Sequence, residues 1–82
     1  MTFKVYVLRS LKDGKRYVGM TADLERRLRE HEKGSVKSTR NRRPLELIYQ
    51  EEYPNRKQAW EREKYLKSGR GREWLNEFGA DG

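Results

Sequence analysis

The sequence of 82 residues contains no cysteine, one histidine and two prolines. The lack of cysteine excludes disulfides, zinc ribbons, iron–sulfur clusters and thiol nucleophiles, and a single histidine excludes a histidine-rich metal site. No apolar run approaches the ~18 residues of a membrane-spanning helix. The N-terminal segment alternates charged and apolar residues instead of forming a secretory signal, so we expect a cytoplasmic protein that does not associate with membranes.

Hydrophobic residues are scarce as well, at 33% of the chain, while charged residues reach 40%. That balance would suit a disordered chain, but two Trp, five Tyr and two Phe residues and regularly spaced aliphatic positions favour a folded one. A domain of this size buries only about 60% of the surface that its unfolded chain exposes. We therefore expect one small domain without a deep cavity or a large buried cofactor.

Basic side chains outnumber acidic ones by 20 to 13, and the excess lies in the first half of the chain. Residues 1–45 carry 13 basic and 5 acidic side chains, whereas residues 46–82 carry 7 and 8. The excess peaks in a segment without any acid, which contains Lys33, Lys37, Arg40, Arg42 and Arg43. Such a patch attracts a polyanion by releasing its counterions. Charge alone favours a nucleic-acid partner, and a solvated loop that keeps the protein soluble is the alternative.

Three segments have the alternation and the β-branched or aromatic content of strands, at residues 3–8, 15–20 and 45–52. The turn signal Lys12-Asp13-Gly14 separates the first two, which predicts an antiparallel hairpin. In this hairpin Tyr6 lies on the opposite face of its strand from Val5 and its other odd-numbered neighbours.

Helices are predicted after the second and the third strand. The first is expected to start after Thr21 as its cap and to stop at Gly34. The second is expected to start after Asn55 and to end where residues 68–71 break it, before a short last helix that ends at Gly79. The order ββαβαα indicates an α/β (α+β) domain with a three-stranded, mostly antiparallel sheet flanked by helices.

Glu63 disagrees with the periodicity of the second helix. It lies three or four residues from Ala59, Trp60 and Leu66, which define the apolar face. A carboxylate at the edge of an apolar stripe needs a cation or a hydrogen-bond donor as a partner, because its unpaired burial is costly. Two interpretations remain open: an ion pair with an arginine, and a metal ligand or catalytic carboxylate.

Arg27 and His31 lie four residues apart, and hence on one face of the first helix beside its apolar stripe. Together they can bind and polarise phosphate oxygens. The alternative is a structural Arg27–Glu63 ion pair, with His31 as a partly exposed residue at the boundary of the core.

Tyr6 and Tyr17 are expected to be cross-strand neighbours on one face of the hairpin. Tyrosines in strands usually serve packing, but a hydroxyl here could also orient or deprotonate a water. Gly19, near the same face, leaves room for the close approach of a ligand or of another backbone.

The ordered set of Lys4-Val5-Tyr6, Tyr17-Val18-Gly19, Arg27, His31 and Glu63 resembles the GIY-YIG nuclease superfamily. The most specific part is residues 17–28. With residues 43–47 and 62–67 it is similar to the small stand-alone bacterial branch that is related to the excinuclease C N-terminal module. The resemblance covers residues 2–77 as a GIY-YIG nuclease-like domain and leaves residues 78–82 as a C-terminal tail.

The resemblance implies a sheet flanked by helices and the metal-dependent hydrolysis of phosphodiesters, usually in DNA. It implies that Glu63 holds a single divalent cation, Mg²⁺ or Mn²⁺, and that Arg27 steadies the scissile phosphate. It further implies that Tyr6 or Tyr17 acts as a general base or positions the attacking water, and that His31 assists proton transfer. Two positions depart from the pattern. Lys4 stands where the family has a glycine, and Met20 stands where the excinuclease relatives have a lysine. His31 would then take over the role of that lysine in assisting the tyrosine.

We therefore expect a structure- or damage-directed DNA endonuclease of the repair or recombination type, with RNA as a further possible substrate. We expect no attached specificity domain, so sequence preference should be weak, or a partner protein should supply targeting. The side chains expected to contact nucleic acid are Lys15, Arg16, Lys33, Lys37, Arg40, Arg42, Arg43 and Lys67. The alternatives are a non-catalytic basic module that binds nucleic acid and, less strongly supported, a basic surface that docks on an acidic protein.

Overall fold

The structure is a computed structural model, and it describes residues 1–78. The elements follow in the order β1 (Phe3–Ser10), β2 (Arg16–Thr21), α1 (Leu24–Lys33), the short 3-10 helix η1 (Arg40–Arg42), β3 (Leu45–Tyr53), α2 (Arg56–Lys67) and α3 (Gly69–Phe78). Apart from η1, this is the predicted order ββαβαα, and the predicted fold class is confirmed.

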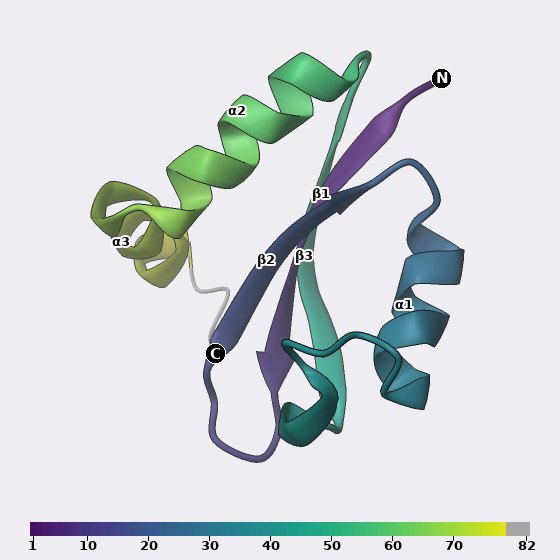
Figure 1. Ribbon diagram of the computed structural model, residues 1–82. Coiled ribbons are helices and arrows are strands. Elements are labelled where there is room, and N and C mark those ends of the chain that lie inside the picture. Colours follow the sequence, from purple (N-terminus) through teal and green to yellow (C-terminus); the bar gives the residue numbers. More distant parts are fainter. Residues whose placement is uncertain (79–82) are drawn as a thin grey trace.

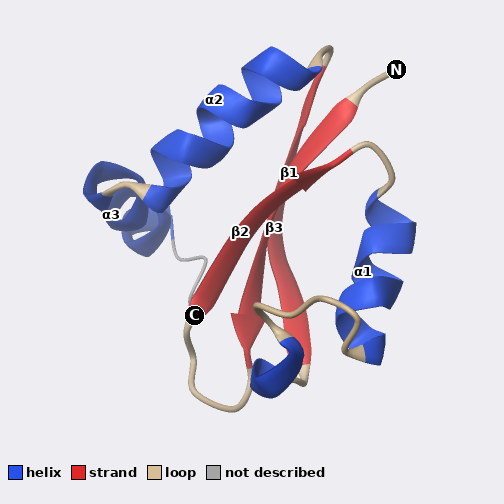
Figure 2. Ribbon diagram, in the orientation of Figure 1, coloured by secondary structure: helices blue, strands red, loops and turns tan. Residues whose placement is uncertain are grey.

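Strand β1 is the centre of the three-stranded sheet, whose order is β2-β1-β3 (Figures 1 and 2). Both neighbours run antiparallel to it, and Tyr6 pairs with Gly19 of β2. Helix α1 covers one face of the sheet, while α2 and α3 cover the other (Figure 1). Because β1 is covered on both faces, four consecutive residues, Val5 to Leu8, are buried.

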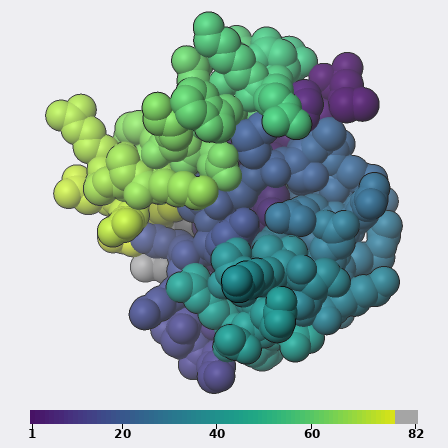
Figure 3. Space-filling model, in the orientation of Figure 1, coloured from purple at the N-terminus to yellow at the C-terminus, as the bar shows by residue number. Residues whose placement is uncertain are grey.

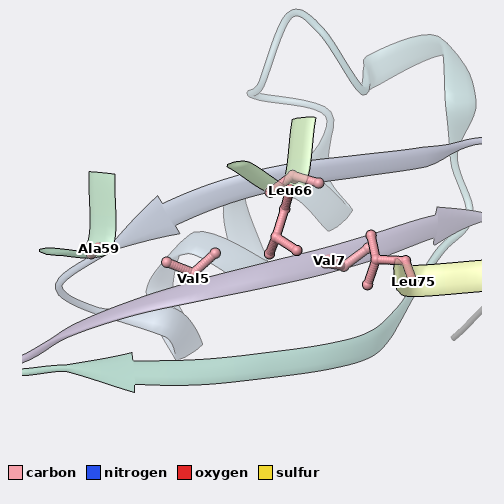
Figure 4. Close-up of a cluster of buried hydrophobic side chains, with 6 residues drawn as sticks. Val5, Val7, Ala59, Leu66 and Leu75 are labelled. Carbon is pink, nitrogen blue, oxygen red and sulfur yellow. The ribbon is translucent and has the colours of Figure 1, made fainter. Parts of the chain in front are cut away.

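The hydrophobic core fills the space between the sheet and the helices α2 and α3 (Figure 4). Val5 and Val7 of β1 pack in one cluster with Ala59 and Leu66 of α2 and with Leu75 of α3. Burial of a Val or Leu side chain stabilises a fold by about 1.5–3 kcal/mol. This layer therefore fixes where α2 and α3 lie on the sheet.

Trp60 does not belong to the core, contrary to the prediction from the sequence. Its side chain is 49% exposed, and Lys64 Nζ lies 4.4 Å from the centroid of its ring. Ala59 and Leu66 are buried because seven residues return a helix to nearly the same side. Trp60 is rotated by about 100° from Ala59 and thus points outward.

The caps predicted at Gly34 and Asn55 are confirmed, whereas the cap predicted at Thr21 is not. Asp23, not Thr21, caps α1: its Oδ1 accepts a hydrogen bond from the backbone N–H three residues on, at 3.1 Å. The Thr21 hydroxyl instead accepts the backbone N–H of Asp23 at 3.1 Å. Gly34 ends α1 with a φ of 82°, and Asn55 caps α2, as predicted.

The break between α2 and α3 is shorter than predicted, because only Ser68 lies outside a helix. Gly71 makes this tight corner possible, since a Cβ atom there would lie 2.1 Å from the carbonyl oxygen of Tyr65. The predicted stop at Gly79 lies outside the described residues, as does most of the tail predicted at residues 78–82. None of the helices within residues 1–78 combines the length and the apolar character needed to cross a bilayer.

Candidate active site

Three of the five predicted catalytic side chains meet on the face of the sheet that α1 covers. The hydroxyl of Tyr6 lies 2.9 Å from Nε2 of His31. The ring centroids of Tyr6 and Tyr17 are 6.3 Å apart, and the His31 ring lies 5.7 Å from the first and 5.2 Å from the second. Two neighbouring strands and a helix thus bring two phenols and the chain's single imidazole into contact.

Gly19 allows Tyr6 to lie across β2. A Cβ atom at this position would lie 2.6 Å from the Tyr6 hydroxyl oxygen and 3.0 Å from Cε1 of Tyr17. The room expected at Gly19 is therefore filled by the chain's own tyrosine rings. Tyr6 is consequently fixed by its surroundings before any substrate arrives.

Tyr6 and His31 are both buried, with 1% of each residue exposed. His31 is therefore not the partly exposed boundary residue of the alternative interpretation. Burial raises the pKa of Tyr6 to about 12, although hydrogen bonding and charge from Arg27 oppose this. Burial and then the charge of Arg27 lower the pKa of His31. Both side chains are therefore neutral at pH 7.

Arg27 reaches the same site from α1. Its Nη1 lies 2.9 Å from Oε1 of Glu30, and hydrogen bonding to Glu30 and then to Tyr6 raises its pKa, so the guanidinium stays charged. The alternative Arg27–Glu63 ion pair is replaced by two others, since Glu63 Oε2 lies 3.3 Å from Lys67 Nζ. Arg27 also lines a recess of about 400 Å³ with Arg26 and Arg56.

Glu63 lies on α2, the helix that packs on the opposite face of the sheet, and its side chain is 16% exposed. It is outside the contacts among the rings, yet its charge contributes to the raised pKa of Tyr6. Its ion-pair partner Lys67 lines the same groove as Tyr17. The charge of Glu63 therefore acts on the site although its side chain lies on the opposite face of the sheet.

The carboxylates near the site decide how it could hold a metal ion. Within residues 1–78, no group of three or more His, Asp or Glu side chains is placed to hold a metal. Mg²⁺ keeps several of its waters and is often bound by one or two carboxylates together with substrate phosphates. Glu63 offers one such carboxylate, and Lys67 Nζ lies 3.3 Å from its Oε2.

A basic groove of about 720 Å³ lies beside Tyr17. Among the described residues its lining includes no acid and five cations, which are Lys15, Arg16, Arg42, Lys67 and Arg72. Figure 3 shows the region from which it is built, with β2 in blue between α2 in green and the loop after α1 in teal. Phosphates are attracted to such a cluster of like charge.

The eight side chains predicted to contact nucleic acid divide into two sets. Lys15, Arg16, Arg42 and Lys67 line the basic groove. Lys33, Lys37, Arg40 and Arg43 are exposed elsewhere. Arg43 is also engaged by the fold, because it donates to the carbonyl oxygens of Glu32 at 3.1 Å and Arg40 at 3.0 Å.

The sequence analysis missed two residues of the site. Arg72 of α3 lines the groove, and the signal for it was its place three residues before the buried Leu75, directly after the segment interpreted as a helix break. Thr39 is 0% exposed, and its Oγ1 lies 2.7 Å from Nδ1 of His31. Thr39 lies in a loop, so no periodicity marks it.

A second polar cluster, also missed, holds α2 against β3. Both oxygens of Glu51 accept from Arg62 at 2.9 Å, and Tyr53 donates to Glu51 at 2.6 Å. Tyr49 also donates to Glu51, and the Arg62 guanidinium lies 4.9 Å from the ring centroid of Trp74. Since Arg62 precedes Glu63 in α2, this cluster helps to set where Glu63 lies.

Known proteins share this sequence pattern and this fold. The family model of the GIY-YIG catalytic domain matches residues 3–76. A UPF0213 protein of Clostridium perfringens is 42% identical over 64 residues, which are 77% of this chain and 68% of that protein. A UPF0213 protein of Natronomonas pharaonis is 43% identical over 65 residues, which are 78% of this chain and 75% of that protein.

The fold itself is similar to a solved structure. The solution NMR structure of a UPF0213 protein from Bacillus halodurans matches with a TM-score of 0.59 and 36% identity, over 95% of this chain and 85% of that one. The resemblance drawn from the ordered motifs is thereby confirmed. The chain belongs to the GIY-YIG family of nuclease domains, among its small UPF0213 members.

Proposed function

We propose that this protein is a metal-dependent endonuclease that hydrolyses phosphodiester bonds in DNA. The observation that carries the proposal is that the rings of Tyr6, Tyr17 and His31 meet, with Arg27 close to Tyr6, and that Tyr17 lines a basic groove whose described lining contains no acid. A protein that only binds DNA needs the groove, and a buried tyrosine–histidine hydrogen bond next to it would serve only its fold. Catalysis by proton transfer does use such a pair.

Tyr17 is the tyrosine that reaches the substrate. It is half-buried and lines the basic groove, whereas Tyr6 is 1% exposed and lies behind it. We assign to the Tyr17 hydroxyl the contact with the attacking water, and to Tyr6 and His31 the support of proton transfer from behind.

Arg27 is suited to the phosphate because its charge is permanent and its position is fixed. Glu30 holds Nη1, and a guanidinium has five N–H donors, so others remain for phosphate oxygens. Donors that are already in place stabilise the charge that develops on the phosphate in the transition state. Glu63 would hold the divalent cation, which when bound stabilises the charge on the phosphate and on the leaving oxygen.

The groove also suggests how the substrate is selected. Its charged side chains are of the kind that contacts phosphates, and phosphate contacts carry no sequence information of their own. We therefore propose weak sequence preference, with cleavage directed by DNA structure or damage or by a partner protein. A DNA substrate agrees with the cytoplasmic location expected from the sequence.

The test is an incubation of the purified protein with branched, nicked and single-stranded DNA in the presence of Mg²⁺ or Mn²⁺. Cleavage is expected on at least one substrate, and Glu63→Gln is expected to abolish it with an unchanged circular dichroism spectrum. Glu61→Gln, on the exposed part of the same helix, is the matched control and should cleave like the wild type. Undiminished cleavage by Glu63→Gln would reject the metal role of Glu63.

The second candidate function is a non-catalytic module that binds DNA or RNA, and the basic groove favours it as strongly as it favours the nuclease. It predicts binding that weakens steeply with salt, while the nucleic acid stays intact under every metal condition. Intact substrates in the incubation above, together with such binding, would replace the nuclease proposal by this one.

A further inference from the structure

Thr39 is the buried polar residue of the site that the proposed reaction does not yet use. It lies directly before η1, with 0% of its surface exposed, and its hydroxyl makes no capping hydrogen bond to that helix. Its Oγ1 is instead 2.7 Å from Nδ1 of His31. This hydroxyl is thus placed to influence which nitrogen of the imidazole carries the proton.

The two hydrogen bonds of His31 are not independent of each other. A neutral imidazole has one N–H donor and one acceptor nitrogen, and the bond made by one nitrogen decides the role of the other. If Nδ1–H donates to Thr39 Oγ1, then Nε2 keeps its lone pair and accepts the O–H of Tyr6 at 2.9 Å. Sites in which a third group orients a base next to a reacting hydroxyl have this arrangement.

We propose that Thr39 is a positioning residue that holds His31 in the tautomer protonated on Nδ1, so that Nε2 can take the proton of Tyr6. In this relay the attacking water gives a proton to the Tyr17 hydroxyl, that hydroxyl passes its own proton to the Tyr6 oxygen, and the Tyr6 proton moves to Nε2. The imidazole becomes an imidazolium, and its Nδ1–H group continues to donate a hydrogen bond to Thr39 Oγ1. The catalytic consequence rests on the proposed nuclease function, whereas the tautomer exists without any substrate.

The tautomer can be measured directly, because His31 is the only histidine of the chain. In a nitrogen-15-labelled sample at neutral pH, long-range proton–nitrogen correlation should show Nδ1 protonated and Nε2 unprotonated. Thr39→Val keeps the shape and removes the oxygen, so the ring should change to the Nε2–H tautomer. Thr39→Ser should restore the wild-type pattern, and Ser35→Ala, in the exposed part of the same loop, should leave it unchanged.

The kinetic test separates positioning from mere folding. Thr39→Val is expected to lower kcat for DNA cleavage by about tenfold or more, with KM unchanged, since general acid–base steps contribute on the order of 10²–10⁴. Thr39→Ser should recover most of that loss. Thermal unfolding of each variant shows whether the comparison is made between folded proteins.

The possible outcomes are distinct. An Nε2–H tautomer in the wild type, or a tautomer unchanged by Thr39→Val, would overturn the inference. A kcat of Thr39→Val equal to that of the wild type would also overturn it. The expected tautomers in a protein that cleaves no DNA would instead contradict the proposed nuclease function, and the measured role of Thr39 in orienting His31 would stand.

Discussion

At the scale of single residues, Arg27 connects the parts of the site. One side of its guanidinium is held by Glu30 at 2.9 Å, and its charge acts on the pKa of both Tyr6 and His31. An arginine held in this way offers a fixed planar set of donors, which the flexible ammonium of a lysine does not. The geometry of the guanidinium, and not its charge alone, is therefore what the proposed reaction depends on.

Arg27→Lys is expected to lower the rate of DNA cleavage by about 100-fold or more, because losing one well-placed transition-state donor has an effect of this order. The affinity for DNA should change less than about twofold, since the net charge is kept. Single-turnover cleavage and a binding titration measure the two quantities. Arg29→Lys, on the exposed part of the same helix, is the control, and equal losses in both variants would contradict the assignment.

His31 gives the stability of the protein a predictable dependence on pH. Its pKa in the folded protein is lowered, chiefly by burial, from the ordinary 6.5, so the unfolded chain binds a proton at a higher pH than the folded one. The contribution of neutral His31 is complete above about pH 6.5 and is lost as the pH falls through its folded pKa.

Urea unfolding at pH 7.5 and at pH 5.5 measures this effect. The wild type is expected to lose stability between the two conditions, and His31→Gln should lose less. The pKa of Glu30 is lowered by Arg27, and that of Glu51 is lowered by Arg62 and its tyrosine partners against the effect of burial, so both titrate below this window. A loss of the same size in His31→Gln would mean that another group is responsible.

At the scale of secondary-structure elements, the cluster of Glu51 and Arg62 sets the position of α2. The pair has two hydrogen bonds of 2.9 Å, with side chains 17% and 25% exposed. Removal of one partner leaves the other charge partly buried without its counterion. The cluster thus joins β3 to the helix that carries Glu63.

Arg62→Ala is expected to lower the free energy of unfolding by about 2–3 kcal/mol, somewhat below the range for a fully buried pair. Arg70→Ala, at an exposed position of α3, should change it by less than about 0.5 kcal/mol. Urea unfolding measures both. An effect of Arg62→Ala as small as that of Arg70→Ala would show that the cluster does not hold the helix.

The basic groove is built by separate elements, so its charges can be removed without changing the catalytic side chains. Arg42 comes from η1 and Arg72 from α3. Arg42→Ala with Arg72→Ala should weaken DNA binding about equally for all sequences. The slope of log affinity against log salt concentration should fall by about 1.8 if both contact phosphates of a duplex.

Arg29→Ala with Arg70→Ala removes the same charge at exposed positions outside the groove. This double variant should keep nearly the wild-type slope. If the two double variants have the same slope, then DNA does not follow the groove.

The elements were largely predictable from the sequence, because their signals are local. Alternation within each strand and the caps at Gly34 and Asn55 depend on residues close together in the chain. Thr39 was not predictable, since its partner His31 lies eight residues away across a loop. Trp60 was wrongly placed in the core, because helical spacing alone does not decide which side of an apolar stripe faces the sheet.

The proximity of three candidate side chains was predictable, but the arrangement of the site was not. The family resemblance selected Tyr6, Tyr17 and His31 from motif order, and the structure brings their rings together. It gave no sign that Glu30 would be the partner of Arg27, nor that Lys67 would be the partner of Glu63. Such pairs are decided by side-chain packing in three dimensions, which a motif does not contain.

At the scale of the whole molecule, the sheet is covered on both faces although the chain is short. The core layer on one side holds α2 and α3, and the layer on the other side contains Tyr6 and His31. A small core contains few buried side chains, so each buried aliphatic side chain should contribute a large share of the free energy of unfolding. Outward-facing aromatic side chains should contribute little to it.

Leu66→Ala is expected to lower the free energy of unfolding by about 2–5 kcal/mol, because a buried leucine leaves a cavity. Trp60→Ala should cost less than about 1 kcal/mol despite the larger side chain, since half of it is exposed. Chemical unfolding of both variants measures the difference. A larger loss for Trp60→Ala would place the tryptophan in the core after all.

The tight fit of Tyr6 over Gly19 also bears on how relatives of this protein can be interpreted. A chain whose catalytic use had lapsed would still have to keep both residues, because a larger side chain at Gly19 would collide with the Tyr6 ring and a different side chain at Tyr6 would disturb the buried packing of the central strand. Their persistence in a descendant therefore reports on architecture. Packing does not require the more accessible Tyr17 and Arg27. Their replacement in a relative would therefore indicate that the relative has lost nuclease activity.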